Sequence, residues 1–145
     1  MSQLISKTIL IEASLAIVWE CLTNPALMEQ WMAEPEINVQ IDTDWKVGST
    51  VTVSGFHHVS FTNKGTVLQF DPFKALRYTH LSSVSQLPEV PESYCVFEFL
   101  LEPAGDQISL TVNISNFPTE SIFRHLDLYW KTTIGIFKDF VENSL

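Results

Sequence analysis

With 145 residues, 46% of them apolar and 17% charged, the chain has the length and composition of one globular domain with a single hydrophobic core. Its 17 acidic residues against 8 Lys and Arg give a formal net charge of −9, which opposes phosphate contacts and excludes nucleic acid as an expected partner. No stretch approaches the roughly 20 apolar residues of a membrane span, so we expect a cytoplasmic protein with no membrane partner.

The cysteines and histidines predict a fold without a metal, a cofactor or a disulfide. Cys21 and Cys95 are far apart and have apolar neighbours, which is typical of buried thiols in a reduced compartment. His57 and His58 are adjacent in a predicted strand, so their side chains are expected on opposite faces, where they cannot ligate one metal.

The first part of the chain predicts a strand followed by two short helices. Residues 4–11 are short and rich in β-branched side chains, which favours a strand. Ser14 is a suitable N-cap for a helix from about residue 15. The pair Asn24-Pro25 ends that helix and begins a second one over residues 26–32. Both helices are too short to cross a sheet, so we expect a bent plug at one end of it.

The middle of the chain predicts an antiparallel meander. Turn residues recur after Pro35, and the runs between them are strand-like and joined by short loops, which favours hairpins over parallel crossovers. Apolar and polar residues alternate, so one face of the sheet is apolar and the other is wet. The alternation is clearest at Ile37, Val39 and Ile41, at Val51 and Val53, and at Ile108, Leu110, Val112 and Ile114.

The last segment, residues 119–143, predicts one long amphipathic helix. At 100° per residue its apolar side chains fall within roughly 120°. They are Ile122, Leu126, Tyr129, Trp130, Thr133, Ile136, Phe137 and Phe140, with Arg124, Lys131, Lys138 and Glu142 opposite them. Leu128 and Gly135 are exceptions on the polar side.

The order of elements and several local motifs resemble one known family. The chain resembles the START-like or SRPBCC superfamily, with its birch-pollen-allergen-like helix-grip fold, and within it the branch named after the activator of the heat-shock-protein ATPase. The motifs are Ile11-Glu12-Ala13-Ser14 before Val18-Trp19, Thr23-Asn24-Pro25, Trp31, Trp45-Lys46-Val47-Gly48-Ser49, Gly65-Thr66-Val67-Leu68 before Asp71-Pro72, Leu76-Arg77-Tyr78-Thr79, and Trp130 with Phe137-Lys138.

This resemblance implies an α+β fold over residues 1–145 as a single domain. A curved antiparallel sheet of about seven strands would carry two short helices after its first strand and a long C-terminal helix over its inner face. Because a bent sheet around one helix leaves interior volume, a ligand cavity is expected between them. The same aromatic residues could also simply fill a core, and the sequence does not separate these two possibilities.

We therefore expect non-catalytic binding of a small, mainly apolar molecule. Tyr78 and His80 share a strand face and would supply polar tips in the cavity, and the loop over residues 82–93 is either its rim or lid or a solvated loop. The full set of candidate residues is Trp31, Val53, His57, Tyr78, His80, Phe97, Phe99, Leu110, Val112, Trp130 and Phe137.

Two other functions stay open. One is a chaperone-associated interaction domain, whose partner would be a chaperone or a second copy of the chain. The other is an enzyme of the polyketide-cyclase or hydrolase kind, in which His80, Tyr78 or His57 acts as acid or base.

Overall fold

The computed structural model describes residues 3–144 and contains one seven-stranded antiparallel sheet with the strand order β1-β7-β6-β5-β4-β3-β2. Strands β2 to β7 follow one another as a meander, and β1 joins beside β7, which confirms the α+β helix-grip prediction. The elements are β1 (Leu4–Ile11), α1 (Leu15–Thr23), α2 (Pro25–Trp31), η1 (Pro35–Ile37), β2 (Gln40–Asp42), β3 (Thr50–His57), β4 (Val59–Asp71), β5 (Ala75–His80), η2 (Ser83–Ser85), η3 (Pro91–Ser93), β6 (Cys95–Ala104), β7 (Gln107–Ser115) and α3 (Glu120–Glu142).

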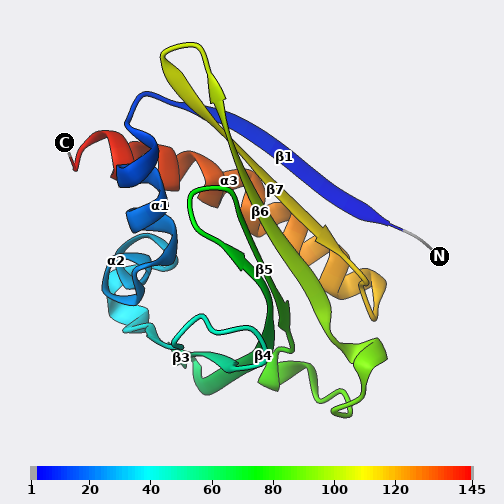
Figure 1. Ribbon diagram of the computed structural model, residues 1–145. Helices are drawn as coiled ribbons and strands as arrows, with labels where there is room; N and C mark the ends of the chain where they lie inside the picture. The colour runs from blue at the N-terminus through cyan, green and yellow to red at the C-terminus, as the bar shows by residue number, and fades with distance from the viewer. Residues whose placement is uncertain (1–2, 145) are drawn as a thin grey trace.

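The two short helices begin and end where their capping residues predict. The Ser14 hydroxyl accepts a hydrogen bond from the Ile17 amide at 3.3 Å. The Asn24 side chain accepts one from the Ala26 amide at 2.9 Å, and Pro25 occupies the first position of α2. These caps satisfy amides that have no partner inside the helix. In Figure 1 the two helices sit together at one end of the sheet.

Strand β2 is shorter than the alternation of apolar residues predicts. Ile37, which we expected in the strand, lies in the 3-10 turn η1. Pro35 begins that turn, and Asn38 has the left-handed φ of 51°, which an asparagine adopts more readily than most residues. The chain therefore becomes extended only at Gln40.

Helix α3 lies against the inner face of the curved sheet (Figure 1). The Thr119 hydroxyl caps it by accepting a hydrogen bond from the Ile122 amide at 3.1 Å. One part of the predicted stripe is wrong, because Ile136 is 47% exposed. The residues of α3 that are buried are Leu126, Trp130, Thr133, Ile134, Phe137 and Val141.

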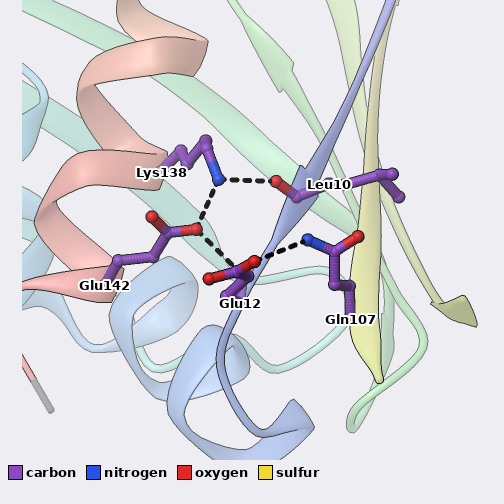
Figure 2. A network of polar contacts seen from close by, with 5 residues as sticks. All are labelled: Leu10, Glu12, Gln107, Lys138 and Glu142. Carbon is purple, nitrogen blue, oxygen red and sulfur yellow. Dashed lines mark hydrogen bonds and ion pairs between the residues drawn. The ribbon is translucent and has the colours of Figure 1, made fainter. Parts of the chain in front are cut away.

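Side chains cap backbone groups on both outer strands of the sheet. On β1, Lys138 donates a hydrogen bond to the Leu10 carbonyl at 3.0 Å, and just after the strand Glu142 accepts one from the Glu12 amide at 2.9 Å (Figure 2). On β2, Glu29 accepts a hydrogen bond from the Ile41 amide at 2.9 Å. Unpaired groups on an edge strand invite pairing with another chain, so these contacts protect the edges.

The sequence placed Lys138 and Glu142 opposite the apolar stripe of α3, and the structure shows that their side chains reach β1 and its exit. They also form an ion pair with each other. The Glu12 amide and the Lys138 ammonium both favour the carboxylate, and together they lower the pKa of Glu142. Helix α3 is therefore fixed to the exit of β1 by polar contacts as well as by its apolar stripe.

Candidate functional site

The predicted aromatic site residues meet in the interior between the sheet and the helices. Ring centroids of Trp31 and Phe137 lie 4.8 Å apart, and those of Phe99 and Trp130 lie 5.6 Å apart. Tyr78 on β5 reaches Phe97 on β6 at 5.5 Å. Each of these side chains is at most 4% exposed. Leu110, Val112 and, at its margin, Val53 belong to the same hydrophobic cluster.

His57 lies apart from this interior. Its side chain is exposed near the end of β3, where the chain turns into β4. The expectation that His57 and His58 point to opposite faces is also wrong, because their rings lie 4.6 Å apart. The reason is that His58 has a φ of 66° and forms the turn, so the period of two that holds along a strand does not apply to it. We therefore remove His57 from the candidate site.

Trp130 carries an unusual polar atom. Its side chain is 2% exposed, and its indole Nε1–H has no hydrogen-bond acceptor among the described residues. Two other buried indoles are satisfied, since Trp31 donates to the Cys21 carbonyl at 2.9 Å and Trp45 donates to the Thr23 carbonyl. A buried donor without a partner costs about 1 to 3 kcal/mol. This donor is therefore available to a bound molecule.

The other polar groups of the interior are held in their neutral forms. Burial, with the neighbouring His125 as a second cause, lowers the pKa of His80 to about 4. Burial also raises the pKa of the Tyr78 hydroxyl above its usual value, with Tyr129 as a second cause. A desolvated charge is costly, so these groups donate or accept hydrogen bonds as uncharged partners.

Tyr129 is a member of this polar group that we did not include from the sequence. Its hydroxyl donates to the Met32 carbonyl after α2, and burial raises its pKa to about 12. Its ring lies 5.3 Å from that of Trp130. The sequence placed Tyr129 on the apolar stripe of the last helix, but that signal does not distinguish a binding residue from a core residue.

The depressed pKa of His80 predicts a loss of stability in mild acid. The unfolded chain binds this proton near pH 6.5, whereas the folded chain binds it only near pH 4, so acidification favours unfolding between these values. The free energy of unfolding should fall by up to about 1.4 kcal/mol per pH unit in this window. Chemical denaturation from pH 8 to pH 4 measures the slope, which His80→Gln should reduce. An unchanged slope in the variant would contradict the assignment.

Two hollows on the described part of the chain lie outside the aromatic interior. One, of about 280 Å³, lies next to the start of the predicted lid loop, against Thr62, Lys64, Leu81, Ser82, Ser83, Leu87 and Glu89. The other, of about 290 Å³, lies at the β3–β4 hairpin near Ile37, Gly55 and Phe61. In this conformation the rings between the sheet and α3 pack against one another, and a ligand that enters there has to displace side chains.

The loop over residues 82–93 is attached to β4 by polar contacts. The Ser83 hydroxyl accepts a hydrogen bond from the Thr62 amide at 2.9 Å, and the Asn63 side chain accepts one from the Ser83 amide at 3.2 Å. Lys64 and Glu89 form an exposed ion pair. Val84 and Val90 are 57% and 40% exposed. The loop is therefore attached to β4 by hydrogen bonds and an exposed ion pair, while two of its valines stay largely in solvent.

Residues 3–144 contain neither a metal-binding cluster nor a membrane-spanning helix. No group of three or more His, Cys, Asp and Glu side chains in this range is arranged to hold a metal ion. None of the helices within it has the length and the apolar character that crossing a bilayer requires. Both cysteines are buried free thiols, as predicted.

The curved sheet, the long helix across it and the apolar interior between them define a helix-grip protein of the START-like class. Residues 12–142 match the sequence model of the family described as activator of Hsp90 ATPase homolog 1-like protein, and the chain belongs to this family. No curated protein matches the chain.

Solved structures agree with this fold. The solution structure of ChR145 from Cytophaga hutchinsonii is 29% identical, covers 98% of this chain and 95% of its own, and has a TM-score of 0.81. The solution structure of the Aha1 dimer from Colwellia psychrerythraea is 22% identical and has a TM-score of 0.75; the match covers 97% of this chain and 96% of the Aha1 chain. DynU16, described as a putative protein in the dynemicin biosynthetic locus, is 18% identical and has a TM-score of 0.74; the match covers 97% of this chain and 48% of the DynU16 chain.

Proposed function

We propose that the chain binds a small, neutral, mainly apolar molecule between the sheet and α3. The observation that carries this proposal is the buried indole N–H of Trp130, which has no acceptor among the described residues. A ligand with one hydrogen-bond acceptor on an apolar body would satisfy this donor and contact the rings of Phe97, Phe99 and Tyr129 around it. The neutral forms of His80 and Tyr78 support an uncharged ligand over an ionic one.

The same groups support binding over acid–base catalysis. A general acid or base works best when its pKa lies near the working pH. His80 has a pKa of about 4, and burial raises the pKa of Tyr78, so neither group exchanges a proton readily near neutrality. This argument favours the non-catalytic function over a cyclase or hydrolase.

A panel of matched compounds tests the proposal. Each pair has the same apolar body, and one member carries a carbonyl that the other lacks. A carbonyl compound at about 100 times its dissociation constant should stabilise the fold by about 2.7 kcal/mol in thermal unfolding. It should also shift the Trp130 indole N–H signal in a ¹⁵N NMR spectrum, because that proton gains an acceptor.

Trp130→Phe is the control, since it keeps an aromatic ring and removes the donor. The variant should bind the carbonyl compound about 2- to 12-fold more weakly and the matched hydrocarbon equally well. If no compound of the panel shifts the thermal midpoint, the proposal fails. Binding that leaves the indole signal unmoved would exclude Trp130 as the donor.

The family match supports a second candidate, binding to an Hsp90-type chaperone. In this case the ligand would be a protein, and the contact would be on the surface. Purified chaperone should then form a concentration-dependent complex with this chain, and its ATPase rate should change. An unrelated acidic protein is the control.

A further inference from the structure

The outer face of α3 has features that the core and the ligand interior leave unexplained. At 100° per residue, the face opposite the buried stripe includes Ser121, Arg124, Leu128, Lys131, Thr132, Gly135, Asp139 and Glu142. Leu128 on this outer face is 68% exposed. An exposed leucine alone is ordinary, but here it shares a helix face with a glycine.

Within residues 3–144, no packing contact accounts for the glycine at position 135. A Cβ atom added there would meet nothing within 4 Å, so no neighbouring group requires the glycine. Glycine inside a helix is nonetheless less favourable than alanine by about 1 kcal/mol. A recess in the middle of an exposed helix is useful where another backbone or a large side chain approaches closely.

The residues of the outer face are arranged symmetrically about its middle. Leu128 and Gly135 lie at equal distances in sequence from the midpoint between Lys131 and Thr132, about one helical turn away on either side. Arg124 and Asp139 lie at equal distances about two turns away. A two-fold axis through this midpoint therefore places a cation opposite an anion and a large side chain opposite a recess.

We infer that α3 pairs with α3 of a second copy of this chain in an antiparallel, two-fold dimer. Leu128 of each copy enters the recess at Gly135 of the other, and Arg124 of each copy lies beside Asp139 of the other. A two-fold interface must be complementary to itself, and this face meets that condition in both shape and charge.

Charge favours this face over the rest of the surface. The chain has a net charge of −9, so most contacts between two copies would bring like charges together. The outer face has two cations, Arg124 and Lys131, and two anions, Asp139 and Glu142, so it is neutral while the chain as a whole is acidic. Arg124 also lies 3.2 Å from Glu120 of its own helix, but this exposed pair is weak and leaves Arg124 free to reach a second partner.

Sedimentation equilibrium of the full chain over a wide concentration range tests the inference. The unaltered protein should dimerise reversibly, and Leu128→Ser should weaken the dimer by about tenfold or more. Gly135→Gln should abolish the dimer by filling the recess. The same change should raise the thermal midpoint of the dilute monomer by roughly 2 to 4 °C, because it removes a helical glycine. Loss of the dimer in a more stable monomer cannot be attributed to misfolding.

A charge exchange tests the register. Arg124→Glu and Asp139→Arg should each weaken the dimer by about three- to tenfold, and the double variant should recover it. Glu102→Arg, on the exposed end of β6, is the matched control for the change in net charge and should have little effect. A protein that stays monomeric at every concentration overturns the inference, as does a dimer insensitive to Leu128→Ser and Gly135→Gln. A double variant that stays as weak as the singles overturns the antiparallel register.

Discussion

Replacing Trp130 with alanine should lower the free energy of unfolding by about 3 to 5 kcal/mol, the usual cost of removing a large aromatic side chain from a packed core. The indole is surrounded by rings, with centroids 5.3 Å away at Tyr129, 5.6 Å at Phe99, and 6.3 Å at both Trp31 and Phe97. These neighbours come from β6, α2 and α3, so they cannot all move into the space that the indole leaves. Urea denaturation followed by circular dichroism gives the value.

Trp130→Phe is the matched control for this measurement. It retains most of the ring contacts and removes the N–H that lacks an acceptor, so its cost should be much smaller than that of alanine. A loss below about 1.5 kcal/mol in Trp130→Ala would mean that the indole already borders a void. That result would contradict the packed interior and would favour a preformed ligand cavity.

Gly65→Ala should also lower the free energy of unfolding by about 3 to 5 kcal/mol. The Cβ atom of an alanine at this position would lie 1.7 Å from the Thr79 carbonyl oxygen. The contact is with backbone, so no change of rotamer relieves it. Next to it, the Thr66 amide donates to the Thr79 hydroxyl at 2.8 Å, and the β4–β5 register shifts between Val67 and Gln69. The methyl group must therefore push β4 away from β5 next to a place where their pairing is already irregular.

Gly135→Ala provides the comparison, since it adds the same methyl group where nothing lies within 4 Å. It should stabilise the dilute protein by up to about 1 kcal/mol through helix propensity. Thermal unfolding of both variants measures the contrast. If the thermal midpoint of Gly65→Ala lies within a few degrees of that of the unaltered protein, Gly65 of β4 does not lie as close to Thr79 as the structure shows.

The sequence was most informative where a local interaction determines the structure. Ser14, Asn24 and Pro25 act within one turn of their own helices, and the structure confirms both helix starts. The period of two in β7 is also local and identified the buried face of that strand. The period of 3.6 in α3 identified four of the six buried residues of the helix and missed Ile134 and Val141. The fold class and its family followed from the order of these elements.

Local patterns failed where backbone conformation departs from a regular element. Asn38 and His58 adopt left-handed conformations, so β2 begins later than predicted and two histidine rings come together. The alternation of apolar residues does not reveal these left-handed positions, because the same alternation can continue through a turn that interrupts a strand.

The candidate site depended mostly on tertiary structure. Periodicity placed Tyr78, His80 and Trp130 on inward faces, but it did not show which polar atoms find partners. Trp31 and Trp130 are both buried indoles, yet one donates to the Cys21 carbonyl and the other to nothing among the described residues. Hydrogen bonding depends on groups from distant segments to within tenths of an ångström, so only the assembled fold determines which donor is left for a ligand.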